Sequence, residues 1–237
     1  MACIELSVDP KAIGSIEFLA PTVASLIKQD TLRDTTGAIA PLRARVFSAD
    51  GEEMTDIEVT FVNTDSLVTI KDGNLVVSTR DTVGFAKVYA TAGGLQSNAR
   101  SIEVIRRPDS IAPRVAVDTV AYKAPTTGTS LDTASVGFIV RSGTNTVGSV
   151  RVTFRLYRGG TLLAPGDTVR YALVTALGRV STVDTTDASG LALRVLRVRT
   201  PAGTTETDTL VVRASTALGG PPLKGDTIAV TILVRPL

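Results

Sequence analysis

The sequence predicts an all-β protein composed of two tandem β-sandwiches. Its 237 residues are too many for one ordinary sandwich and enough for two. Apolar residues make up 43% of the chain, with 4% aromatic residues and no Trp, so Val, Ile, Leu and Ala must supply the core. Val and Thr are abundant, and both favour strands. Apolar residues recur at every second position rather than at the 3.6-residue spacing of a helix.

The first predicted elements are two short apolar runs, 15–20 and 23–32, separated by Pro21. Proline interrupts the hydrogen-bond ladder of a sheet, so it suits an edge strand that passes from one sheet to the other. We therefore expect these runs to belong to different sheets.

The segment 41–63 predicts a β-hairpin. Leu42, Ala44 and Val46 alternate with arginines, and the turn signal Asp50-Gly51 follows. A second alternating run over 57–61 is the predicted partner strand, with one face of each strand buried.

The segment 66–105 continues the pattern. Asp72-Gly73 predicts a turn, the run 84–90 alternates small and apolar residues, and Gly93-Gly94 turns the chain into a closing strand near Ile102. We place a first domain at 15–107, after an N-terminal segment 1–14.

A stiff linker is expected at 108–113, which begins and ends with proline and follows two adjacent arginines. The second domain, 114–237, then offers strands at regular intervals, separated by turn signals such as Gly159-Gly160 and Gly219-Gly220. Regularly spaced strands without helices predict a sandwich.

Residues about 40–105 resemble a bacterial immunoglobulin-like domain of group 2. The matching pieces are "RARVFSADGEEMTDIEVTF", "NTDSLVTIKDGNLV" and "GFAKVYATAGGLQS". That family often has Trp where this chain has Phe61, a conservative departure because a large aromatic ring still fills the core. The resemblance implies an immunoglobulin-like sandwich found mostly outside the cytoplasm, often as a spacer or adhesion module.

The stretch 181–200 contains the turn Asp187-Ala188-Ser189-Gly190 between two alternating runs. It resembles the turn of invasin- and intimin-type immunoglobulin-like repeats, over about 20 residues. We predict a β-hairpin corner in which the Asp187 carboxylate caps the turn and Gly190 takes a positive φ.

The composition argues against catalysis. The chain has no His, which removes the commonest general base and metal ligand, and Cys3 is its only cysteine. No nucleophile elbow, phosphate-binding glycine loop or EF-hand spacing occurs. Asp50, Glu52, Glu53 and Asp56 gather oxygen ligands that calcium favours, but a solvated acidic turn is the preferred interpretation. We therefore expect no enzyme, cofactor or metal.

Charge is distributed unevenly between the halves. Residues 1–108 contain 11 Lys and Arg against 14 Asp and Glu, whereas residues 109–237 contain 14 against nine. A basic half suits an acidic protein surface or lipid headgroups. The predicted partner-contact face consists of Arg151, Arg155, Tyr157, Arg197 and Arg199. One aromatic residue is too few for nucleic acid, which we exclude as a partner.

Cys3 follows Ala2, as at the end of a lipoprotein processing site. The charged and apolar segments that complete such a site are not in the sequence, so two interpretations stay open. In the first interpretation Cys3 carries a lipid anchor on the outer side of a membrane, and in the second it is an ordinary free thiol.

These features predict a non-catalytic, extracytoplasmic structural protein with protein partners. The first interpretation is a membrane-extrinsic scaffold subunit that holds a membrane-protein complex together through protein–protein contacts, and a lipid anchor at Cys3 would also attach it to the membrane surface. The chain is similar in this respect to an extrinsic subunit of a bacterial photosynthetic reaction-centre–antenna complex, although no particular residues carry that similarity. The alternatives are a cell-surface adhesin or spacer and, with less support from its few aromatics, a carbohydrate-binding accessory module.

Overall fold

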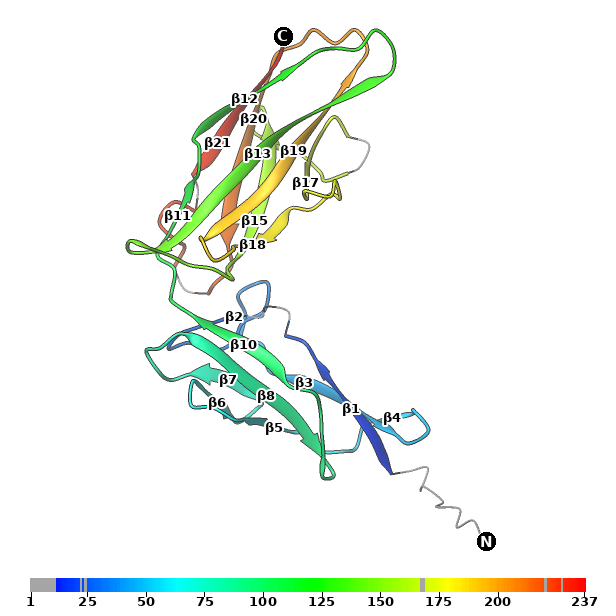
Figure 1. Ribbon diagram of the computed structural model, residues 1–237, viewed down its shortest axis with the longest axis vertical. Helices are drawn as coiled ribbons and strands as arrows, with labels where there is room; N and C mark the ends of the chain where they lie inside the picture. The colour runs from blue at the N-terminus through cyan, green and yellow to red at the C-terminus, as the bar shows by residue number, and fades with distance from the viewer. Residues whose placement is uncertain (1–11, 22, 24, 167–168, 220, 227) are drawn as a thin grey trace. The chain divides into compact units, whose positions relative to one another are not determined.

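The chain forms two immunoglobulin-like β-sandwiches in tandem, as the sequence predicts (Figure 1). The structure, a computed structural model, describes every residue except 1–11, 22, 24, 167–168, 220 and 227. All assigned elements among the described residues are strands. The chain divides into two compact units, Met1–Arg106 and Arg107–Leu237, which are called here the first and second domains.

The first domain packs two sheets around a small apolar core. Phe18 and Phe61, one from each sheet, lie with ring centroids 5.3 Å apart, and Leu26, Val88 and Ile102 are buried around them. The three-stranded sheet has the order β1 (Ile13–Leu19), β3 (Arg43–Ser48), β4 (Glu53–Met54). The second sheet has the order β2 (Ser25–Ile27), β10 (Arg100–Ile105), β8 (Gly84–Ala92), β5 (Thr60–Asn63), with β9 (Leu95–Gln96) paired to β8 and a separate hairpin of β6 (Val68–Lys71) and β7 (Leu75–Ser78).

The predicted change of sheet at Pro21 is present. β1 pairs with β3, whereas β2 pairs in parallel with β10 in the other sheet. The proline lies between β1 and β2, where no ladder bond is lost.

The predicted hairpin over 41–63 is wrong in its second strand. β3 turns at Asp50-Gly51 into the two-residue strand β4, and Val46 pairs with Met54. The chain then leaves this sheet, and Phe61 on β5 pairs with Ala90 in the opposite sheet. Both sheets present one face to the same core, so a strand with alternating apolar residues can bury its apolar face equally well in either sheet.

The second domain is larger than the first. Phe138 and Phe154, from opposite sheets, meet edge to face with centroids 5.7 Å apart. The first sheet, called the β13 sheet, has the order β11 (Ser110–Pro113), β13 (Thr129–Ser142), β19 (Leu191–Pro201), β17 (Tyr171–Val174), with β14 (Asn145–Thr146) on β13. The second, called the β20 sheet, has the order β12 (Val117–Tyr122), β21 (Ala229–Pro236), β20 (Asp208–Thr216), β15 (Arg151–Arg158), β16 (Thr161–Leu162), with β18 (Val183–Thr185) on β15.

Two predicted boundaries differ from the structure. The segment predicted as a linker, 108–113, contains β11, which joins the second domain because Ile111 is buried and its amide donates to the Lys224 carbonyl at 2.9 Å. At the other end, β1 begins at Ile13, inside the segment 1–14 that was assigned to no domain.

The turn at Asp187 has the predicted geometry but joins different strands from those expected. Asp187 Oδ1 accepts hydrogen bonds from the Ser189 amide (2.8 Å), the Ser189 hydroxyl (2.7 Å) and the Leu191 amide (3.1 Å), and Gly190 has a φ of 73°. The flanking strands β18 and β19 lie in different sheets. The turn is therefore a corner between the sheets and not a hairpin within one.

The same turn occurs in the first domain, where the sequence analysis did not find it. Asp34 Oδ1 accepts from the Thr36 amide (2.8 Å), the Thr36 hydroxyl (2.6 Å) and the Ala38 amide (3.1 Å), and Gly37 has a φ of 87°. The spacing D-x-[S/T]-G-x is common to residues 34–38 and 187–191.

Candidate contact surface of the second domain

The outward face of the β20 sheet contains an unusual set of side chains. Alternation along each strand and the register between strands determine which residues share this face. On β15 and β20 they are Arg151, Thr153, Arg155, Tyr157, Thr209, Val211, Arg213 and Ser215. On the other strands they are Val117, Thr119, Ala121, Leu162, Val183, Thr185, Ala229, Thr231, Leu233 and Arg235. We call these residues the arginine face.

Charge on the arginine face has one sign. Four of its members are arginines, and none is Asp, Glu or Lys. Arg151, Arg155 and Tyr157 were predicted from their spacing along one strand. Arg213 and Arg235 were missed, because their strands join β15 only through pairing that the sequence does not reveal.

Arg155 and Arg213 are directly opposite each other on neighbouring strands. Like charges in that position repel and destabilise a sheet. Two contacts hold the guanidinium groups in place. Arg213 lies over the ring of Tyr157, 5.0 Å from its centroid, and Arg155 Nη1 donates to Ser215 Oγ at 3.2 Å. No carboxylate compensates the pair within the arginine face, so an anionic partner would relieve the repulsion.

Arg197 and Arg199, predicted to share this contact face, lie on the opposite side of the domain. They occupy β19 of the β13 sheet, and the outward sides of two stacked sheets point in opposite directions. Both side chains are partly buried, and Arg197 Nη2 donates to the Gly166 carbonyl at 3.4 Å. The five predicted contact residues therefore form two surfaces.

A second polar cluster lies at one end of the domain and is structural in character. Asp208 Oδ2 accepts from the Tyr171 hydroxyl at 2.8 Å and from Arg158 Nε at 2.6 Å, while Arg170 bonds Glu206 at 2.9 Å. Burial raises the pKa of the Tyr171 hydroxyl, and its hydrogen bond to Asp208 adds to the rise. A phenol with a raised pKa donates a hydrogen bond at neutral pH and does not act as a base.

A partly buried ion pair lies at the corner of the sandwich. Arg194, only 8% exposed, extends from β19 to Asp184 on β18, with Nη1 and Oδ1 3.1 Å apart. Asp184 Oδ2 also accepts from the Leu193 amide at 2.7 Å. The pair joins the two sheets, and its charges are compensated within the domain.

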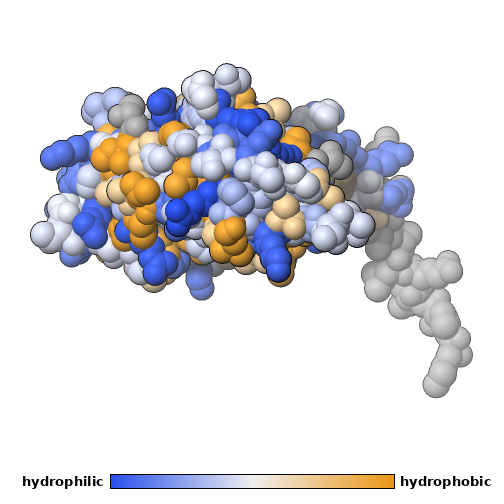
Figure 2. Space-filling model, turned by 90° about the horizontal axis from the view of Figure 1, so that it is seen from above, coloured by the Kyte–Doolittle hydropathy of each residue, from blue (hydrophilic) through white to orange (hydrophobic). Residues whose placement is uncertain are grey.

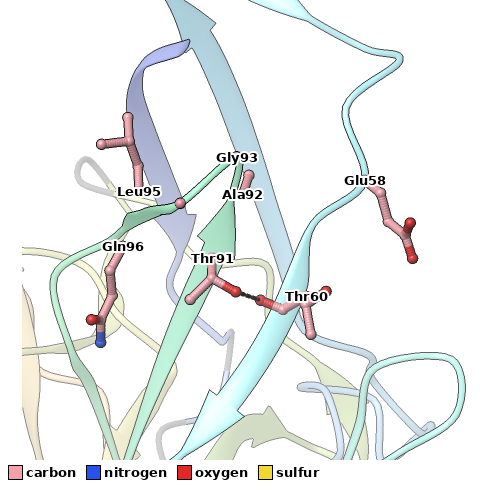
Figure 3. A pocket seen from close by; sticks show the side chains of 8 residues that line it. Glu58, Thr60, Thr91, Ala92, Gly93, Leu95 and Gln96 are labelled. Carbon is pink, nitrogen blue, oxygen red and sulfur yellow. Dashed lines mark hydrogen bonds between the residues drawn. The ribbon is translucent and has the colours of Figure 1, made fainter.

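Two hollows of the described surface do not bring an acid and a base together. One, of about 390 Å³, lies beside the β8–β9 turn, and its lining includes one carboxylate, Glu58. Figure 3 shows the Glu58 side chain pointing away from the other labelled residues, while Thr91 Oγ1 donates to the Thr60 carbonyl at 3.2 Å. The other, of about 200 Å³, is mostly apolar and has Arg155 and Tyr171 as its ionisable residues.

Figure 2 shows hydrophobic atoms in separate patches between hydrophilic ones on the face it presents. Among the described residues, no group of three or more His, Cys, Asp or Glu side chains could hold a metal ion, and no helix is long and apolar enough to cross a membrane. Cys3, the predicted lipid anchor, lies outside the described residues.

Comparisons with known proteins find solved structures of similar fold but no family to which the chain can be assigned. No protein-family model matches the sequence, and no curated protein matches it. Solved structures that resemble the chain include domains 4 and 5 of the S-layer protein SbsC, with 13% identity over 95% of this chain and 99% of that one, at a TM-score of 0.35. The adhesin InvE of Yersinia pseudotuberculosis matches with 14% identity over 94% of this chain and 60% of that one, at 0.37.

The D0-D1 domain of intimin matches with 13% identity over 95% of this chain and 98% of that one, at a TM-score of 0.29. Similarity at this level assigns neither a family nor a function to the chain. None of these three structures is a photosynthetic subunit, and the expectation of a reaction-centre–antenna subunit has no support.

Proposed function

We propose that the protein is a non-catalytic, extracytoplasmic module of the adhesin or spacer kind, which works through protein–protein contact. The arginine face is the observation that supports this proposal. It combines four arginines with Tyr157 and aliphatic residues such as Val211 and Leu233, and it has no Asp, Glu or Lys. Arg and Tyr are enriched in protein interfaces, whereas Lys, Glu and Asp are depleted.

A non-catalytic role agrees with the chemistry of the described residues. General acid–base catalysis needs a titratable side chain positioned within reach of the substrate. The strongly bonded groups in the second domain, Asp184 and Asp208, have their charges compensated by arginines inside the sandwich or at its end. Their role in this proposal is to hold the sheets in register.

The spacer interpretation ranks above the membrane-extrinsic scaffold. The scaffold interpretation draws part of its support from a lipid anchor at Cys3, which is outside the described residues. A spacer or adhesin depends only on two folded sandwiches and an exposed contact face, and the described residues supply both.

Protease accessibility tests the proposal in the organism that makes the protein. Intact cells are treated with an added protease, and the protein is followed by immunoblot beside a cytoplasmic marker protein. We expect the protein to be digested while the marker survives. Protection that persists after the outer envelope is made permeable, with digestion only when the cytoplasmic membrane is broken, would place the protein inside the cytoplasm and overturn the proposal.

A further inference from the structure

We propose that the arginine face binds a second copy of this chain, through the acidic surface of that copy's first domain. This inference rests on the proposed function, because it names the partner of the same contact face. Its starting point is the uncompensated pair Arg155 and Arg213, which are opposed across β15 and β20 with no carboxylate on their face. Tyr157 and Ser215 hold the two guanidinium groups in place before any partner binds.

The composition of the face favours a protein partner over a lipid surface or a nucleic acid. Attachment to anionic lipid uses clusters of Lys and Arg beside a membrane span or on an amphipathic helix, whereas this face lies on a sheet, and binding to single strands uses several exposed aromatic rings. This face has no Lys and one aromatic residue, Tyr157, between aliphatic neighbours. Guanidinium groups beside apolar side chains suit carboxylates on a folded protein, which they can bind through two parallel hydrogen bonds.

The first domain of the same chain offers matching charge. Its segment 50–58 contains five acidic residues and no Lys or Arg, and all five side chains are exposed. One of them, Glu53, has its Oε1 atom 3.7 Å from Arg45 Nε, so its charge is partly offset. The segment as a whole stays strongly acidic. The residues in question are Asp50, Glu52, Glu53, Asp56 and Glu58.

The two surfaces belong to different domains, so the contact between copies is heterologous. Each copy presents one arginine face and one acidic segment, and binding through one leaves the other free. Contacts of this kind produce rings when they close and extended chains when they do not. Exposed charges contribute modestly and are screened by salt, so the association is concentration-dependent and weakens as salt is added.

Sedimentation velocity of the full chain over a range of protein concentrations tests the proposal. In about 0.01 M salt, where screening extends over about 30 Å, the weight-average sedimentation coefficient rises with concentration, and in about 1 M salt the rise disappears. R155Q/R213Q weakens the association about tenfold. The matched control R114Q/R141Q removes the same charge from exposed arginines outside the arginine face and leaves the association unchanged.

A charge exchange separates binding from folding. R155E/R213E cancels the positive charge of the arginine face and keeps the acidic segment, whereas E52R/D56R removes most of the negative charge of that segment and keeps the arginine face, so neither variant associates with itself. An equimolar mixture of the two variants restores association, which a variant that had simply lost its fold could not do. A wild-type chain that stays monomeric at every concentration in low salt, or a mixture that does not recover, overturns the inference. Protease digestion of the protein on intact cells is unaffected by either result, so the proposed function is judged separately.

Discussion

The turns at residues 34–38 and 187–191 share one local design and differ in what surrounds them. In both, an Asp side chain accepts from two amides and one hydroxyl, and a Gly follows at positive φ. The first closes locally, with Arg33 bridged to Ile39. The second connects β18 to β19 across the two sheets. The five-residue pattern therefore specifies the turn, and contacts distant in sequence decide which strands it joins.

The environment of Gly190 is crowded. A Cβ atom at this position would lie 2.7 Å from the carbonyl oxygen of Val140 and 2.9 Å from the Thr146 Cβ. The Val140 carbonyl belongs to the backbone of β13, and it cannot move aside without disturbing this inner strand of the sheet. The glycine is required both for its φ of 73° and for the close approach of β13.

The largest expected effect follows from this contact. Gly190→Ala should lower the free energy of unfolding of the second domain by about 3 kcal/mol, because strain at positive φ and overpacking add. Gly37→Ala should cost the first domain about 1 kcal/mol, from its positive φ. Urea unfolding followed through amide NMR signals of each domain measures both. Equal losses would contradict the distinction drawn between the two turns.

The pH dependence of stability is the next largest effect and should be shared by the turns. The hydroxyl of Ser189 and the Leu191 amide lower the pKa of Asp187 below its ordinary value of 3.8, and the hydroxyl and amide of Thr36 do the same for Asp34. A carboxylate with a lowered folded-state pKa stabilises above its unfolded pKa. That stabilisation is lost as pH falls through the folded pKa, in the range below 3.8.

Acid unfolding of Asp34→Asn and Asp187→Asn tests this sign. Asparagine keeps an acceptor oxygen and does not titrate, so each variant should lose less stability than the wild type between about pH 5 and pH 2. The effect should appear only in the domain that contains the substitution. A variant whose acid transition matched that of the wild type would show that its aspartate does not contribute.

The sequence predicted which face of a strand is buried better than it predicted which strands pair. The alternation of Leu42, Ala44 and Val46 correctly predicted which face of their strand points to the core. Pro21 correctly predicted the change of sheet. The strand after Asp50 was assigned to the wrong sheet, since an alternating run fits either side of a shared core. The 34–38 turn was detectable, because its spacing repeats that of 187–191.

The candidate contact surface was predictable only in part, for the same reason. Spacing along one strand placed Arg151, Arg155 and Tyr157 together, because alternate residues share a face. The opposed partner Arg213 and the separation of Arg197 onto the other side depend on which strands pair and stack. Those relations are set by contacts between residues distant in sequence, and no local pattern records them.

The smallest expected effect tests whether the two turns are locally equivalent. Ser189→Ala and Thr36→Ala each remove the hydroxyl that contributes most to the lowered pKa of the neighbouring aspartate. Each variant should lose about 0.5 kcal/mol of stability, typical of an exposed hydrogen bond. Carboxyl NMR titration should show the pKa of Asp187 or Asp34 rising toward 3.8 without reaching it, because the two amides still donate. Similar rises in both domains would mean that the five residues alone set the carboxylate's environment, whereas a rise in one domain only would mean that the sheets around the turn contribute.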